Sequence, residues 1–197
     1  SGPGVETLTV PQRATIANMG AEMGATSSIF PADEQVRRFL CAQGREEAYR
    51  LCLADPDADY EESLTIDLSQ VEPMVALPGQ PDRVVPVSQA EPVEFSQIFI
   101  GSCTNGSYTD LARAALVLRG RKVHSGTAVL AACGNRQIYQ MLLRDGYIGM
   151  LVDAGVRFLV CACGPCMGIG QAPASGATIL RTPDRKYPGR SGTPDAD

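Results

Sequence analysis

The chain has 197 residues, 44% of them hydrophobic, which is enough for one or two domains with a packed core. It carries 22 acidic and 17 basic residues, and this acidic balance disfavours nucleic acid as the main partner, because phosphate binding requires clustered Lys and Arg. No apolar run approaches the length of a membrane span, and the first six residues lack a basic-then-apolar signal, so no membrane partner is expected.

Residues 1–68 are predicted to form part of an α/β domain. A helix is expected to begin near Pro11, which suits a first helical turn, and to run to Met23, where Gly24 ends it. A second helix is expected from Pro31 to Gly44, because apolar residues recur there at helical spacing. A short helix at 46–52 and short strands at 25–30 and 64–68 complete this region, with Cys41 and Cys52 as packing residues.

Five prolines predict an extended crossover linker over residues 69–92. From 93 to 197 strand-like and helix-like segments alternate, which predicts a second α/β domain with a three-layer parallel sheet of repeated βα units. The expected strands are 95–100, 127–132 and 157–160, and the expected helices are 107–119, 135–144 and 147–154.

Two cysteine-containing loops follow the expected strands. Cys103 comes after the run ending at Ile100, and Cys163 and Cys166 come after the run ending at Val160. Because binding loops of parallel sheets leave the carboxyl ends of the strands, we expect these thiols to converge on one side of the sheet. The seven clustered cysteines, an odd number, favour a reducing, cytoplasmic compartment over a disulfide scaffold.

Three kinds of site compete for these thiols. Cys163-Gly-Pro-Cys166 is spelled like a redox dithiol, but the two glycines and the proline that follow make a poor helix start. A structural zinc site commonly needs two short-spaced pairs of ligands, and neither Cys103 nor His124 has such a partner. The third possibility is an iron–sulfur cluster held by three cysteines, and the spacing leaves Cys161 as a further candidate.

Taken together, the motifs resemble the aconitase family of hydro-lyases, and single-chain aconitate hydratases most closely. The resemblance rests on Gly101-Ser-Cys-Thr-Asn105 followed by Ala162-Cys-Gly-Pro-Cys166. It extends in order along the chain through Gly2-Pro-Gly-Val5, Ala14-Thr-Ile-Ala-Asn-Met-Gly-Ala-Glu22, Gly168-Ile-Gly-Gln-Ala-Pro173 and Arg185-Lys-Tyr-Pro-Gly-Arg190.

The resemblance implies a role for each matched position. Cys103, Cys163 and Cys166 would hold a [4Fe-4S] cluster with one open iron, and Asn18 and Asn105 would donate hydrogen bonds beside it. Glu22 would serve as the catalytic carboxylate near that iron. Arg185 and Arg190 would bind the carboxylates of a small-molecule substrate.

The implied reaction is the conversion of citrate to isocitrate through cis-aconitate, a step of the tricarboxylic acid cycle. A related dehydratase-isomerase acting on an isopropylmalate-like or homoaconitate-like substrate is the alternative, and a non-catalytic cluster-binding or regulatory module is another. Asp184, Lys186 and Cys133 depart from the family pattern and put the substrate in doubt. Because family members are several times longer, we expect an inactive piece whose partners are the remaining domains or a complementary subunit.

Overall fold

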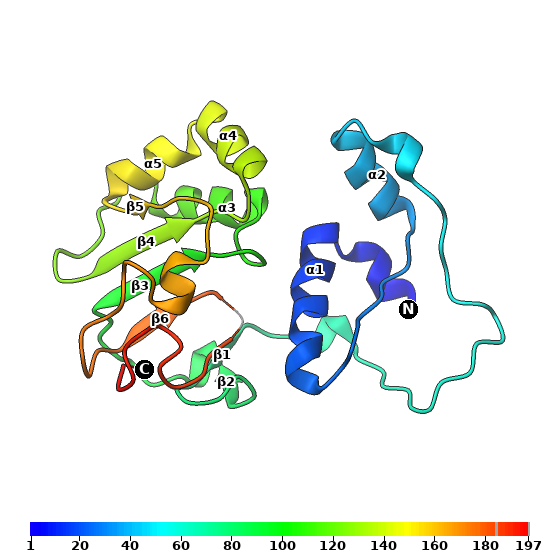
Figure 1. Cartoon of the computed structure of the whole chain (residues 1–197), viewed down its shortest axis with the longest axis horizontal. Coiled ribbons are helices and arrows are strands. Elements are labelled where there is room, and N and C mark those ends of the chain that lie inside the picture. The colour runs from blue at the N-terminus through cyan, green and yellow to red at the C-terminus, as the bar shows by residue number, and fades with distance from the viewer. Residues whose placement is uncertain (184, 197) are drawn as a thin grey trace. The chain divides into compact units, whose positions relative to one another are not determined.

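The computed structural model describes residues 1–183 and 185–196. It divides into two compact units, Ser1–Glu72 and Pro73–Asp197, which are treated separately below. Figure 1 shows the first unit in blue to cyan and the second in green to red. The expected boundaries of a domain at 1–68, a linker at 69–92 and a domain at 93–197 stay a prediction.

The first unit is built from short helices and extended segments. Its helices are α1 (Val10–Asn18) and α2 (Glu34–Ala42), with single 3₁₀ segments at Pro3–Thr7, Met19–Met23, Glu46–Ala48 and Leu68–Gln70. Residues 1–72 are all described and contain no strand, so the strands expected at 25–30 and 64–68 are wrong. Only an isolated bridge joins Ala32 to Cys52. An extended segment needs a neighbouring strand to satisfy its backbone groups, and none is available here.

Three further expectations for this unit are wrong. The helix expected to reach Met23 ends at Asn18 and continues as a 3₁₀ segment, and the helix expected at 46–52 is a single turn. Cys41 and Cys52 are exposed, not packed. The three errors follow from the absence of an apolar core in residues 1–72, where the side chain of Arg13 is the most deeply buried.

Arg13 lies on α1 and connects three segments of the first unit. Its guanidinium donates to the carbonyl oxygens of Val5, Leu8 and Pro31 over 2.8 to 3.0 Å. It also forms a bidentate pair with Asp33, at 2.9 Å to Oδ1 and 2.7 Å to Oδ2. Asp33 is in turn the N-cap of α2 and accepts from the backbone N–H of Gln35. One buried cation therefore holds α1, α2 and the N-terminal segment together.

The second unit contains a parallel four-stranded sheet in the order β5-β4-β3-β6. Its strands are β3 (Gln97–Gly101), β4 (Ala128–Ala132), β5 (Arg157–Phe158) and β6 (Ile179–Arg181). This confirms the expected α/β class, and β6 is an addition. The proline-rich segment before β3 does not run in one direction, because the chain reverses there and β1 (Met74–Ala76) pairs with β2 (Val84–Pro86) as an antiparallel hairpin.

Helices α3 (Tyr108–Leu118), α4 (Arg136–Arg144) and α5 (Tyr147–Ala154) lie together over one face of the sheet, as Figure 1 shows. The main core forms between them and this face, around Leu111, Val129, Ala131, Leu142 and Leu151. The opposite face carries the smaller cluster of Phe99, Leu130 and Ala132. Leu159 and Cys166 cover that cluster, so a loop and a single 3₁₀ turn occupy the place expected for a second helical layer.

Side-chain caps fix where the helices begin, and so where the strand-to-helix loops end. Ser107 and Asp110 form a capping box at the start of α3, with Ser107 Oγ donating to Asp110 Oδ2 over 2.7 Å. Asn135 caps α4, as expected from the sequence, by accepting from the backbone N–H of Ile138. The loop carrying Cys103 is therefore confined to the few residues between β3 and Ser107.

Candidate functional site at the carboxyl edge of the sheet

All four strands of the sheet run parallel, so the loops that follow them leave from one edge. Cys103 follows β3, Cys133 follows β4, Cys163 follows β5, and Arg185 follows β6. The sequence predicted that the cysteine loops share this edge, and the topology confirms it. We call this edge, with the loops 101–106, 133–135 and 159–168 and the segments 182–183 and 185–192, the carboxyl edge.

The loop after β3 packs so closely against the end of β4 that there is no room for a side chain at Gly101. A Cβ on Gly101 would lie 1.9 Å from the carbonyl oxygen of Ala132, and Gly101 has a φ of 120°, which only glycine adopts readily. Ser102 also has a positive φ, 90°, and donates its backbone N–H to Ala132 over 3.2 Å. This strained turn leaves Cys103 exposed at its tip.

Thr182 joins the loop after β3 to the end of β6. Its hydroxyl accepts from the backbone N–H of Gly101 over 2.8 Å. Its carbonyl accepts from Nδ2 of Asn105 over 2.7 Å. Asn105, predicted to donate to a cluster, thus donates to the backbone in this structure, and its predicted role stays a prediction.

The Cys163 loop forms one 3₁₀ turn, Gly164–Met167, which Gly168 ends with a φ of 73°. No helix follows, whereas the N-terminus of a helix is what lowers the thiol pKa in redox dithiols. The conformation therefore disfavours the dithiol interpretation. Cys163 is exposed, while Cys166 is half-buried against the cluster of Phe99, Leu130 and Ala132.

Arg181, at the end of β6, connects the Cys166 loop to the C-terminal segment. Its Nη2 donates to the carbonyl oxygens of Arg185, over 2.7 Å, and Cys166, over 3.4 Å, and its Nη1 donates to Ser191 Oγ. Burial lowers the pKa of Arg181, and the nearby Cys166 thiol works in the opposite direction. A buried cation of this kind places positive potential beside the thiol of Cys166.

The predicted substrate arginines lie in the segment that follows. Arg185 and Arg190 are both partly buried, and the backbone N–H of Arg190 donates to Tyr187 in a turn. The Nε of Arg190 is buried and has no hydrogen-bond partner among the described residues, and the same holds for the Nε of Arg181. Asp184, which departs from the family pattern, lies outside the described residues.

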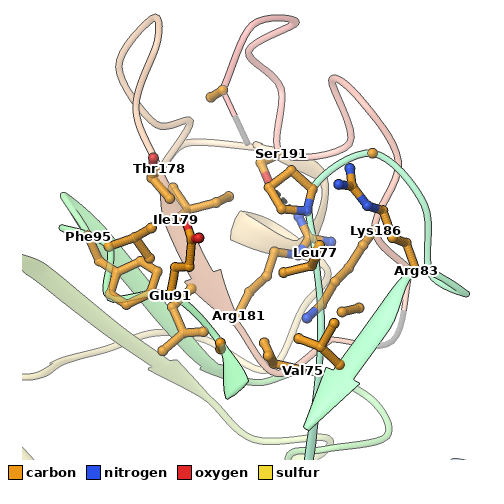
Figure 2. Close-up of a pocket in the computed structure, with 18 of the residues that line it drawn as sticks. Val75, Leu77, Arg83, Glu91, Phe95, Thr178, Ile179, Arg181, Lys186 and Ser191 are labelled. Carbon is orange, nitrogen blue, oxygen red and sulfur yellow. Dashed lines mark hydrogen bonds between the residues drawn. The ribbon is translucent and has the colours of Figure 1, made fainter. Parts of the chain in front are cut away.

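A cavity of about 550 Å³ lies between the β1–β2 hairpin and the strand β6. Figure 2 shows Arg83 and Lys186 on one side of it, Glu91 and Phe95 on the other, and Arg181 between them. Its remaining wall is largely apolar and includes Val75, Leu77, Val85, Val93 and Ile179. Cationic groups beside an apolar wall suit a carboxylate that carries an alkyl group.

Asn18 and Glu22 belong to the first unit. Asn18 is the last residue of α1, and Glu22 lies in the 3₁₀ segment that follows, and both are partly buried. The predicted roles of the two residues stay predictions.

A second pair of thiols meets at the carboxyl edge. Sγ of Cys133, after β4, lies 3.2 Å from Sγ of Cys161, after β5. Cys133 is buried, and burial together with the neighbouring thiol raises its pKa to about 12. The sequence marked Cys133 only as a departure from the family pattern and gave no indication of its partner.

The structure tests the chemistry of a metal centre only in part. Thiolates are the ligands of iron–sulfur clusters, and Cys103, Cys163 and Cys166 all lie on the carboxyl edge with at least partial exposure. Within residues 1–183 and 185–196, however, no three His, Cys, Asp or Glu side chains are grouped closely enough to hold a metal ion. The three thiols are the right kind of ligand for a cluster and lie on the same edge of the sheet, but they are not close enough together to hold one in this structure.

Sequence reasoning missed two residues that organise this edge, Arg181 and Thr182. Neither was given a role, although Ile179 and Leu180 before Arg181 form an apolar run typical of a short strand. That run was the available signal, because a polar residue directly after a strand of a parallel sheet lies at the binding edge.

In the described residues, no helix has the length and apolarity to span a bilayer.

Comparison with known proteins gives one consistent result. The profile of the aconitase family, described as aconitate hydratase, matches residues 1–97 and 89–197. Three relatives are the 3-isopropylmalate dehydratase large subunits of Archaeoglobus fulgidus (subunit 2), Methanopyrus kandleri (subunit 1) and Thermotoga maritima (subunit 1). The first is 42% identical over 100% of this chain and 47% of its own length. The second is 40% identical over 97% of this chain and 46% of its own length. The third is 38% identical over 100% of this chain and 48% of its own length. The chain thus spans about half the length of the curated relatives it matches.

Proposed function

Because the chain belongs to the aconitase family, we propose that it forms part of a hydro-lyase for a 3-isopropylmalate-like hydroxy-dicarboxylate. The observation that carries this function is the family match along the whole chain, joined to relatives that are all named dehydratases. Those relatives support the isopropylmalate-type alternative over the expected conversion of citrate, and they do not support a place in the tricarboxylic acid cycle.

A [4Fe-4S] cluster would be held by Cys103, Cys163 and Cys166 at the carboxyl edge. When bound, it supplies a Lewis-acidic iron that weakens the bond to the leaving hydroxyl. Because these thiols are not grouped in this structure, the exposed loops that carry Cys103 and Cys163 must close for the cluster to be held. Asn18 and Asn105 would donate hydrogen bonds beside it.

The chain's own side chains would bind the substrate and handle its proton. Arg185 and Arg190 would bind the two carboxylates, and the buried Nε of Arg190 still offers a donor. Glu22, the predicted carboxylate near the open iron, would exchange a proton with the substrate hydroxyl.

The partners follow from the relatives' names and lengths. Each relative is called a large subunit, and this chain covers about half of it, so the catalytic unit would include further residues and a complementary subunit. The compartment would be the cytoplasm. We expect the 197-residue chain alone to leave cis-aconitate and 3-isopropylmalate unchanged.

The cluster is tested by anaerobic reconstitution of the chain with iron and sulfide, followed by assay of bound iron and acid-labile sulfide. Replacement of Cys103, Cys163 or Cys166 by Ser should lower both several-fold, because each removes a ligand. The matched control is Cys41→Ser, an exposed thiol of the first unit, which should leave both unchanged. Bound zinc without acid-labile sulfide, or an equal loss in the control, would contradict the cluster.

The substrate is tested with the whole enzyme, assembled with its complementary subunit. We expect turnover of 3-isopropylmalate to exceed turnover of citrate, and Arg190→Lys to raise the KM more than it lowers kcat, because Lys cannot bind a carboxylate bidentately. Preferred turnover of citrate would return the assignment to aconitate hydratase and leave the cluster intact.

A further inference from the structure

The thiols of Cys133 and Cys161 lie 3.2 Å apart at the ends of two adjacent parallel strands. The register of β4 and β5 pairs Ala131 with Phe158, and the backbone N–H of Leu159 donates to Ala131 over 2.8 Å. Cys133 lies two residues beyond Ala131, and Cys161 lies three residues beyond Phe158 in the loop after β5, where the chain brings the two sulfurs together. From this geometry we propose that Cys133 and Cys161 form a reversible disulfide when a peroxide reaches the protein.

The pair differs from the other thiols of the carboxyl edge in its surroundings. Cys133 belongs to the core cluster on the helix-covered face of the sheet, whereas Cys166 contacts the cluster on the opposite face. The neighbours of Cys133 on its own face are apolar, and its Sγ donates only a long contact of 3.4 Å to the carbonyl of Asn135. Among the described residues, Cys161 is the thiol that contacts Cys133.

Only a small movement separates the two sulfurs from a covalent bond. A disulfide has a sulfur–sulfur distance of about 2.0 Å, so closure needs a shift of about 1.2 Å. Cys161 can supply this shift, because it lies in an exposed loop next to Val160, which is 80% exposed. Cys133 is fixed at the end of a buried strand and does not need to move.

The difference in exposure assigns the order of the reaction. Peroxide reaches the exposed Cys161 first, where its sulfur bonds to one oxygen, the O–O bond breaks, and the released hydroxide leaves as water with the thiol's proton. The Sγ of Cys133 then attacks the sulfenic sulfur of Cys161, the S–O bond breaks, and a second water leaves with the proton of Cys133. Two thiols are oxidised by two electrons, one peroxide is reduced to two waters, and a dithiol reductant reverses the change.

The test uses the full chain, reduced and desalted without oxygen, then exposed to one equivalent of hydrogen peroxide and alkylated before digestion with trypsin. Cys133 lies in the tryptic peptide 123–136, and Cys161 in the peptide 158–181. We expect most of the chain to yield these two peptides as a linked pair. Fragmentation should place the link on Cys161, with Cys163 and Cys166 carrying the alkyl group.

Variants separate this pairing from random oxidation. Cys161→Ser, an exposed substitution, should abolish the linked pair and leave Cys133 reduced, whereas Cys163→Ser should preserve the link. A link from Cys133 to Cys163 or Cys166 would overturn the proposal, as would full alkylation of both Cys133 and Cys161 after peroxide. The same treatment in denaturant should distribute the links over all the cysteines, which controls for intrinsic reactivity. The disulfide depends on the sulfur geometry alone, so a failure to assemble a cluster would leave it standing.

Discussion

In residues 1–72 the most buried side chain is the guanidinium of Arg13, whereas the largest fully buried side chains of residues 73–197 include Leu111, Leu130, Leu142 and Leu151. The first unit is therefore held by directional bonds from one cation. The second is held by apolar burial spread over many residues. A network centred on one cation fails when any partner is lost, while an apolar core loses stability in proportion to the volume removed. The three predictions below test that difference.

The largest effect is expected from Arg13→Ala. It leaves the carboxylate of Asp33, whose side chain is 17% exposed, without its counterion, and it removes the guanidinium donor from the carbonyls of Leu8 and Pro31 and from Val5, which still accepts from Leu8. Loss of one partner of a buried ion pair typically costs about 3–5 kcal/mol. Hydrogen exchange should show loss of amide protection throughout residues 1–72 and unchanged protection in α3 and β4. Arg38→Ala, which removes an exposed ion pair, should change neither region, and equal effects of the two variants would refute the central role of Arg13.

A somewhat smaller effect is expected from Leu142→Ala in the second unit. Leu142 is fully buried on α4, and removal of such a side chain costs about 2–5 kcal/mol through lost burial and the cavity left behind. Denaturation in urea should report the loss. The matched control is the next residue, Leu143→Ala, which is 56% exposed and should change the free energy of unfolding by about 0.5 kcal/mol or less. Equal losses from the two leucines would mean that the core does not govern this unit.

The smallest effect is a dependence of the first unit's stability on pH. The hydrogen bonds and charge of Arg13 hold the pKa of Asp33 below its ordinary value of 3.8, so the ionised carboxylate stabilises the folded state. That contribution is complete above the ordinary pKa and is lost as the pH falls through the lowered one. Hydrogen exchange in residues 1–72 should therefore be steady from pH 7 to about pH 5 and accelerate relative to the second unit below about pH 4. Asp33→Asn should weaken this dependence, and an equally steep dependence in the variant would assign it to another group.

The same contrast explains how much could be predicted from the sequence. In the second unit, apolar periodicity and helix-cap residues predicted α3, α4 and α5 to within a residue or two, and also the shared edge of the cysteine loops. These features are local, or follow from alternation of strands and helices. The short β6 was missed, because three residues between turns give little periodicity.

The first unit was predicted less well because its organisation is not local. Arg13 and Asp33 are twenty residues apart, and nothing in the apolar pattern marks them as partners. The alternating residues at 64–68 looked like a strand, but a strand exists only where another strand pairs with it. Likewise the contact between Cys133 and Cys161 depends on which strands are neighbours in the sheet, and the sequence pattern does not determine the order β5-β4-β3-β6.

The backbones of Gly168 and Gly192 touch, and a Cβ on Gly168 would lie 2.1 Å from the carbonyl oxygen of Ser191. The turn that bears Cys166 and the turn that bears Arg190 therefore pack backbone against backbone, and neither has room for a side chain at this contact. A chimera that imports either turn from a relative would have to import the other with it. Gly168→Ala should separate the two turns, although it changes none of the cysteines or arginines themselves.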